Sequence, residues 1–126
     1  MPVSVSEEEF DRILTDAVNR IPSEIREYLV NIVITVKKRP SREMLRELGA
    51  SVGNPPLGLF EGVPRIERSA TVPPLYPDMI CLFQEPLEEM CKTKEELERE
   101  IEVTLVHEVA HYIGMTEKRL TELGYG

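Results

Sequence analysis

The sequence has 126 residues, enough for one domain with a hydrophobic core and too few for two, so we expect a single domain over residues 1–126. Its 23 acidic and 15 basic residues give a formal net charge of −8. This charge argues against nucleic acid and anionic membranes as partners, because both attract basic surfaces.

The start of the sequence has neither the basic residues nor the apolar segment of a signal peptide, and no apolar run approaches membrane-spanning length. We therefore expect a cytoplasmic location.

The two cysteines, Cys81 and Cys91, are too few for a disulfide framework. We expect two free, buried thiols, with Cys81 pointing into the core while Ile80 and Leu82 face the other side of the sheet.

Helical signals dominate the first part of the chain. Ser6 and Glu9 form a capping box, and the apolar residues after them recur at the spacing of one helix face. Pro22 ends this helix, Ser23 can cap a short second one, and Gly49 can close a third. The expected elements are a helix up to residue 21, a helix over 24–28, a β-branched and well-buried strand over 31–36, and a short helix over 41–48.

The middle of the chain is rich in proline and glycine. Residues 63–77 contain four prolines and two arginines, and form either a functional loop or an ordered surface excursion. The remaining expected elements are a loop over 49–56, strands over 57–62 and 78–83, a linker with one helical turn over 85–92, a helix over 94–113 and a last short helix over 116–123. This order predicts an α+β fold in which a small sheet packs on helices.

The long helix contains an HExxH motif formed by His107, Glu108 and His111, and the sequence has no other histidine. At about 100° per residue, the two imidazoles lie about 40° apart and one turn apart, where they can hold one zinc ion. Zinc would acidify a water, and Glu108 would take its proton as the water attacks a carbonyl. The alternative is two surface histidines on an acidic helix.

The residues around this motif support a buried helix. Thr93 and Glu96 form a capping box at its start, and Gly114 is a natural terminator at its end. Apolar residues cover most of the circumference of its second half, which is typical of a buried helix. Buried polar side chains need partners, and a metal is one. Satisfied core histidines are the other interpretation, but they would not explain Glu108.

Residues 107–114, HEVAHYIG, followed by Met115, Thr116 and Glu117, resemble the HExxHxxGxxD/E pattern of the zincin superfamily. The most similar members are small, single-domain bacterial zincin-like metallopeptidases. Other stretches that resemble this family lie at residues 57–62, 77–83 and 86–88. The resemblance covers most of the chain and implies a zincin-like fold, in which a small sheet packs on helices that include the HExxH helix. It also implies that an edge strand lies along the cleft, here the strand at 57–62 or the one at 78–83.

A catalytic zinc usually has three protein ligands, so a third is needed beside the two histidines. The resembling zincins place a ligand three residues after the glycine that ends the helix, and Glu117 stands there. Gly114 in a left-handed conformation would turn the chain back towards the metal. An upstream carboxylate or an exogenous ligand is the alternative. Glu117 would then only favour the dipole of the last helix.

We therefore expect a zinc-dependent hydrolase, a metallopeptidase with one zinc ion per chain. His107, His111 and Glu117 would be the ligands, and Glu108 the general base and then the proton donor to the leaving amine. A further side chain would stabilise the oxyanion. The candidates for that role are Arg65, Arg68, Tyr76 and Tyr112, the last being better placed for the core.

The chain departs from the larger zincins at its end. Only 15 residues follow His111, which leaves no room for a downstream subdomain or for the methionine turn of metzincins. We therefore expect peptides or unstructured protein segments as substrates, or a partner protein that completes the site. Two other classes stay open: a protein whose zinc is structural or regulatory, and an acidic interaction module without metal.

Overall fold

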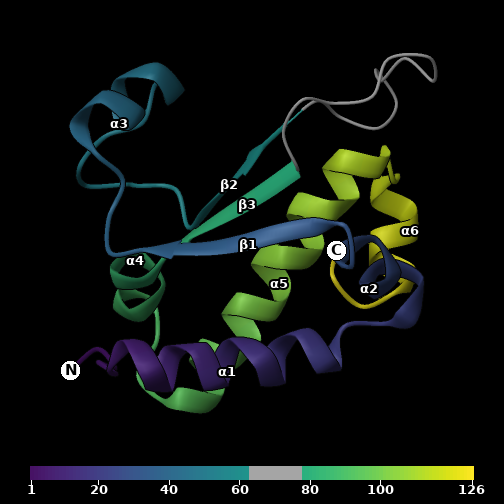
Figure 1. Cartoon of the computed structure of the whole chain (residues 1–126), viewed down its shortest axis with the longest axis horizontal. Coiled ribbons are helices and arrows are strands. Elements are labelled where there is room, and N and C mark those ends of the chain that lie inside the picture. Colours follow the sequence, from purple (N-terminus) through teal and green to yellow (C-terminus); the bar gives the residue numbers. More distant parts are fainter. Residues whose placement is uncertain (63–77) are drawn as a thin grey trace.

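The computed structural model describes residues 1–62 and 78–126. The loop expected at 63–77, with Arg65, Arg68 and Tyr76, lies outside the described residues. The elements are α1 (Glu7–Arg20), α2 (Ser23–Leu29), β1 (Ile32–Lys37), α3 (Arg42–Leu48), β2 (Gly58–Glu61), β3 (Asp78–Phe83), α4 (Gln84–Glu89), α5 (Lys94–Ile113) and α6 (Glu117–Glu122) (Figure 1). The expected α+β class with a small sheet is confirmed.

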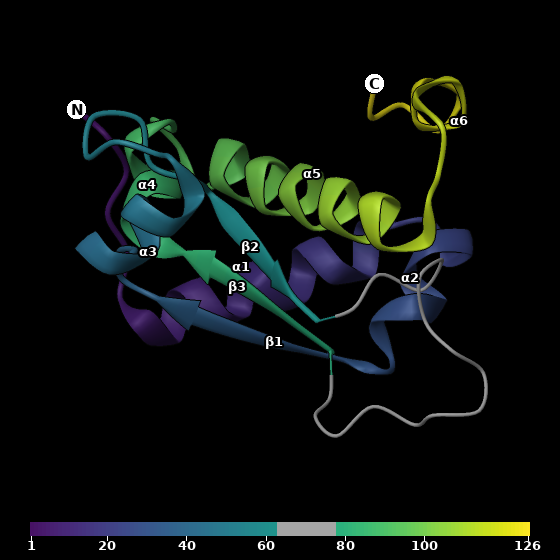
Figure 2. The same ribbon diagram turned by 90° about the horizontal axis from the view of Figure 1, so that it is seen from above.

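The three strands form one sheet in the order β1-β3-β2. β1 runs parallel to β3, with Ile34 opposite Ile80, and β2 runs antiparallel to β3, with Phe60 opposite Ile80. β3 is therefore the central strand, and β2 is an edge strand. Figure 2 shows β2 as the strand nearest α5. Of the two strands considered for the cleft, β2 is the one at an edge of the sheet within residues 1–62 and 78–126.

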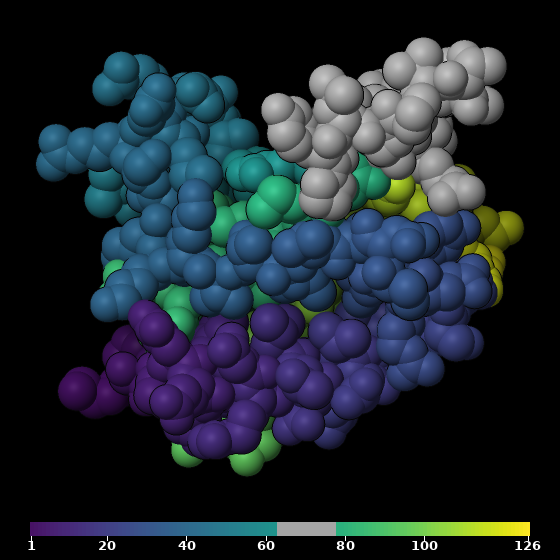
Figure 3. All heavy atoms as spheres, in the orientation of Figure 1, coloured from purple at the N-terminus to yellow at the C-terminus, as the bar shows by residue number. Residues whose placement is uncertain are grey.

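The core lies between the sheet and the helices. α1 packs along α5, and their shared core continues through α2 to the apolar residues of β1 and β3 (Figures 1 and 2). Ile80 and Leu82 point into it and are fully buried. In the space-filling view, α1 and β1 lie side by side on one face of the molecule (Figure 3). The helices described include none with the length and apolar character that crossing a bilayer requires.

Four helices begin with side-chain caps, which include the predicted caps at Ser6 and Thr93. The hydroxyls of Ser6, Ser41, Thr93 and Thr116 each accept a hydrogen bond, at 3.1 Å, from the backbone N–H three residues further on. α2 differs, because Pro22 stands at its N-cap position without a side-chain hydrogen bond and Ser23 is its first residue. The expected Ser23 cap is therefore wrong.

The expectation of a well-buried β1 is also wrong. Ile32 is buried, but Val33 is 45% exposed, and the next three residues are only partly buried. The β-branched composition correctly predicts a strand. It does not show whether the strand is central or at an edge, and β1 lies at an edge with β3 as its one neighbour in the described sheet.

The segment after β3 is more regular than expected. Residues 84–89 form a helix, α4, in which Pro86 occupies the first turn, where an N–H has no partner within the helix. The side chain of Gln84 donates to the carbonyl of Val5 at 3.1 Å, and Glu88 accepts from the Val5 N–H at 2.8 Å. Both polar side chains are buried. α4 thus holds the N-terminal segment at Val5. The residues around α4 in the sequence do not predict these contacts, because Val5 lies far away in the chain.

The prediction of two free thiols is confirmed. Cys81 and Cys91 are free, and their exposed fractions are 2% and 1%. The expected direction of Cys81 is wrong, since Ile80 and Leu82 fill the main core and Cys81 is buried on the opposite face of the sheet. Burial, with the nearby charges of Glu100 and Glu96, raises the pKa of Cys91 to about 11.

Both thiols should react slowly with a disulfide reagent such as dithionitrobenzoate at neutral pH in the folded protein, because the thiolate is the reactive form and neither sulfur is accessible. After denaturation without reductant, the same reagent should count two thiols per chain. Rapid reaction of the folded protein would show that the thiols are exposed. A count of zero with a monomeric mass would reveal a disulfide.

Candidate functional site

The HExxH residues lie in the last turns of α5. This helix spans Lys94–Ile113, as the sequence predicts, and Gly114 ends it in a left-handed conformation with φ 71° and ψ 31°. The N–H of Met115 then donates to the carbonyl of Ala110 at 2.8 Å, which satisfies a carbonyl at the helix end. The chain turns there, and α6 starts three residues after the glycine.

Two contacts hold α5 against the edge strand. A Cβ atom on Gly58 of β2 would lie 2.9 Å from Cγ2 of the buried Thr104 and 3.3 Å from the Cys81 carbonyl oxygen, so the glycine allows the helix to approach closely. Nearer the site, the rings of Phe60 and Tyr112 stack with their centroids 4.8 Å apart. The C-terminal half of α5 is thus fixed along β2.

Tyr112 has a structural role in this arrangement. It is 6% exposed, and its hydroxyl donates to Asp78 Oδ2 at 2.9 Å. The interpretation of Tyr112 as a core residue is therefore confirmed. The other candidates for stabilising an oxyanion lie within residues 63–77, outside the described part of the chain.

Glu108 lies where α5 meets β2. It is partly buried and accepts a hydrogen bond from the backbone of Phe60. Burial raises the pKa of the Glu108 carboxyl above its ordinary value. The charge of His111, the Phe60 hydrogen bond and the charge of His107 oppose this shift without cancelling it. A carboxyl with an increased proton affinity, beside two imidazoles, is suited to proton transfer.

The two histidines have different surroundings. His111 is exposed, whereas His107 is half-buried with its Nε2 atom 2.7 Å from the backbone carbonyl oxygen of Tyr125. A carbonyl oxygen only accepts hydrogen bonds, so Nε2 of His107 is the donor in this contact.

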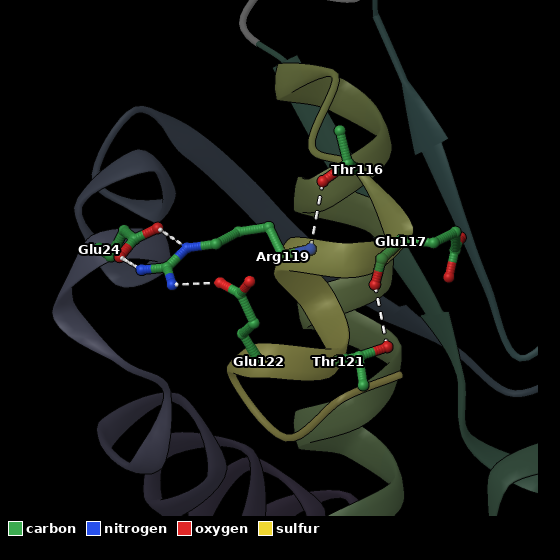
Figure 4. Close-up of polar contacts among 6 residues, drawn as sticks. All are labelled: Glu24, Thr116, Glu117, Arg119, Thr121 and Glu122. Carbon is green, nitrogen blue, oxygen red and sulfur yellow. Dashed lines mark hydrogen bonds and ion pairs between the residues drawn. The ribbon is translucent and has the colours of Figure 1, made fainter.

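Glu117 is exposed and is the first residue of α6. Its side chain extends from the side of α6 opposite to Arg119, and its carbonyl oxygen accepts a hydrogen bond from the Thr121 hydroxyl at 3.0 Å (Figure 4). Within residues 1–62 and 78–126, no three histidine, cysteine, aspartate or glutamate side chains form a group that could hold a metal ion. The ligand role of Glu117 stays a prediction.

Arg119 connects α6 to α2. Its Nε atom donates to Glu24 Oε2 at 3.1 Å, a second guanidinium nitrogen contacts the other oxygen of Glu24, and Nη1 donates to Glu122 at 3.1 Å (Figure 4). The hydrogen bond from Arg119 holds the pKa of Glu24 below its ordinary value. The guanidinium and both carboxylates are substantially exposed, so we expect a modest contribution to stability.

A second set of contacts, which the sequence does not predict, holds Gly124 and Tyr125 on α5. Tyr125 is 6% exposed, and its hydroxyl donates to Glu102, which is 4% exposed. Arg99 pairs with Glu102 at 3.0 Å, donates to the Gly124 carbonyl at 3.2 Å, and lies 5.0 Å from the centre of the Tyr125 ring. These contacts bring the Tyr125 carbonyl to His107. The only sequence signal is an aromatic residue between two glycines.

A separate cavity of about 290 Å³ lies away from these residues. Side chains of α1 and β1, with Lys38 and Gln84, line it, and they include Glu7, Asp11 and Lys37. None of the lining residues belongs to the predicted site. The cavity is therefore not evidence for the HExxH chemistry.

The donor set fits a zinc ion in its chemistry. Two imidazoles one helical turn apart, with a partly buried carboxylate next to them, are the groups that a catalytic zinc site uses. Their arrangement is incomplete in the described structure, because His107 Nε2 faces Tyr125 and Glu117 belongs to no three-ligand group. Binding of zinc through His107 Nε2 therefore requires a change at His107.

We expect Glu108→Gln to stabilise the metal-free protein at neutral pH. Because the pKa of Glu108 is raised in the folded state, its contribution to stability is full below about pH 4.3 and is lost as the pH rises through the raised value. The melting temperature of Glu108→Gln should therefore exceed that of the wild type at pH 7. The difference should shrink as the pH falls to about 4.

The matched control is Glu47→Gln, which changes an exposed carboxylate on α3. Thermal unfolding in a chelating buffer would measure both variants. A melting temperature for Glu108→Gln at or below that of the wild type at pH 7 would contradict the assigned environment of Glu108.

Comparison with protein families identifies a match over most of the chain. The model of a family described as zincin-like metallopeptidase matches residues 29–126. The match contains the three described strands, α5 with His107, Glu108 and His111, and the segment that ends at Gly126. A search of curated proteins gave no match.

Proposed function

The chain belongs to the zincin-like metallopeptidase family, and from this premise we propose that it is a zinc-dependent peptidase that uses the HExxH residues of α5. The observation that carries the proposal is the position of Glu108. It lies on α5 beside both histidines, receives a backbone hydrogen bond from the edge strand, and has a raised pKa. A structural metal site would not need such a carboxyl.

In this proposal His107 and His111 hold the metal and Glu117 is the third protein ligand. Zinc, when bound, lowers the pKa of water and polarises a carbonyl. Glu108 accepts a proton from the attacking water and passes it to the leaving amine. The place of Glu108 on α5, next to His107 and one turn from His111, supports both halves of this cycle.

The edge strand β2 supplies a place for the substrate. β2 pairs with β3 along one side, and Phe60 of β2 contacts both Tyr112 and Glu108 of α5. We propose that an extended peptide or an unstructured protein segment adds along the side of β2 that no described strand pairs with, in the manner of β-augmentation. Its scissile carbonyl would then lie between the strand and the end of α5.

Protein prepared without chelator should contain close to one zinc per chain, and the double variant His107→Ala, His111→Ala should lose it. Glu117→Ala should weaken zinc affinity by at least about tenfold. Glu122→Ala, which removes a neighbouring exposed carboxylate on α6, should leave the affinity unchanged. Metal analysis and competition with a chromophoric chelator would measure these effects.

Equal zinc content in the wild type and the double variant would place the metal elsewhere in the chain. Equal effects of the Glu117 and Glu122 changes would remove Glu117 from the ligand set while leaving the histidines in it.

Glu108→Gln should keep the zinc and lose at least about 100-fold in peptide hydrolysis, because the amide cannot accept the proton. Cleavage of a mixed library of unstructured peptides, followed by mass spectrometry, would measure this loss. Unchanged turnover would exclude Glu108 as the general base. If the zinc-loaded wild type cleaves no peptide in the library, a structural or regulatory zinc becomes the better description.

A further inference from the structure

The contact between His107 and Tyr125 bears directly on metal binding. Nε2 of His107 lies 2.7 Å from the carbonyl oxygen of Tyr125, so this nitrogen carries a proton and donates it. A protonated ring nitrogen has no lone pair for a metal. While the contact lasts, Nε2 of His107 cannot bind zinc.

The carbonyl is held in place by an anchor formed by Arg99, Glu102 and Tyr125. The Tyr125 hydroxyl donates to Glu102, and both residues are more than nine-tenths buried. Arg99 binds Glu102 at 3.0 Å and the Gly124 carbonyl at 3.2 Å, and its guanidinium lies over the Tyr125 ring. Hydrogen bonds to a charged group are stronger than neutral ones, so the anchor is a specific attachment and not a frayed chain end.

The anchor and the second histidine lie on opposite sides of His107 along α5. Arg99 and Glu102 precede His107 by eight and five positions, whereas His111 follows it by four. The Tyr125 carbonyl contacts Nε2 of His107, and an ion bound through Nε2 would need the same nitrogen. The carbonyl and such an ion therefore compete for it.

We propose that residues 124–126 gate the metal site, and that zinc binds Nε2 of His107 together with His111 only when the Tyr125 carbonyl releases that nitrogen. This inference rests on the proposed function, because it takes those two histidines as zinc ligands. The anchor lowers the population of the zinc-competent arrangement, and the apparent zinc affinity falls by the same factor. Tyr125 is therefore a positioning residue that acts on the metal through His107.

Two variants weaken the gate in different ways. Deletion of residues 124–126 removes the carbonyl and the anchor together. Tyr125→Phe keeps the backbone and the ring but removes the hydrogen bond to Glu102. Each should raise zinc affinity, by about tenfold for the deletion and by less for Tyr125→Phe. Tyr28→Phe, which removes a tyrosine hydroxyl on α2, is the matched control and should leave the affinity unchanged.

Zinc affinity would be measured by chelator competition, with the fold of each variant checked by circular dichroism. A second readout follows the segment itself. In ¹⁵N spectra of the wild type, zinc should shift the amide signals of Gly124 and Gly126 towards unstructured values. It should not do so in the variant His107→Ala, His111→Ala.

A gain in affinity for the deletion and for Tyr125→Phe, without a gain for Tyr28→Phe, would support the gate. Unchanged or weaker binding in both variants would overturn it, even if the double histidine variant loses zinc and the proposed metal site stands. If the deletion does not fold, Tyr125→Phe decides alone. Equal zinc binding by the wild type and the double histidine variant would overturn both the metal site and the gate.

Discussion

The close packing of α5 on the edge strand β2 is the constraint on which the candidate site depends. Gly58 leaves room for Thr104, and the stacked rings of Phe60 and Tyr112 fix the helix further along. Because an α-helix repeats every 3.6 residues, fixing Tyr112 against Phe60 also fixes where Glu108 lies, one turn earlier. The partial burial of Glu108 follows from this packing, and burial is the largest cause of its raised pKa.

The two ends of α5 differ in burial and in role. The first part of the helix is held by α1, and buried side chains such as Leu97, Ile101 and Leu105 anchor it in the core. His107 and Glu108 are only partly buried, and His111 is exposed. α5 is thus buried along its first part and carries polar side chains near its C-terminal end. Placing reactive side chains on a well-packed helix is a general way to hold them in position.

The sequence predicts those features that depend on local chemistry. The bounds of α5 are correct because Thr93 and Gly114 act on the turns next to them. β3 is correct because five consecutive apolar residues, 79–83, lie between the polar residues Asp78 and Gln84. The edge position of β1 was missed because alternation and propensity do not report strand order. α4 was missed because Val5, which its buried polar groups bind, lies about 80 positions away in the chain.

The candidate site also combines features that local spacing predicts with contacts that depend on residues far away in the chain. Spacing alone predicts that His107, Glu108 and His111 share one side of a helix. It cannot predict that the Tyr125 carbonyl contacts Nε2 of His107. That contact depends on Glu102 and Arg99, which pair with residues more than 20 positions away. The sequence pattern also sets Glu117 three residues after Gly114, but the direction of its side chain depends on how α6 is attached to α2 through Arg119.

The pairing of α1 with α5 has a consequence for how the chain acquires its structure during synthesis. Phe10, Ile13 and Ala17 are buried in a core completed by residues of α5, roughly 90 positions later in the chain. The Val3 N–H likewise donates to the carbonyl of Cys91 at 2.8 Å. A ribosome makes the chain from its N-terminus, so α1 emerges long before its partner exists, and its apolar face stays uncovered during that time. Its three acidic first-turn residues, Glu7, Glu8 and Glu9, give the waiting segment a charge that opposes self-association.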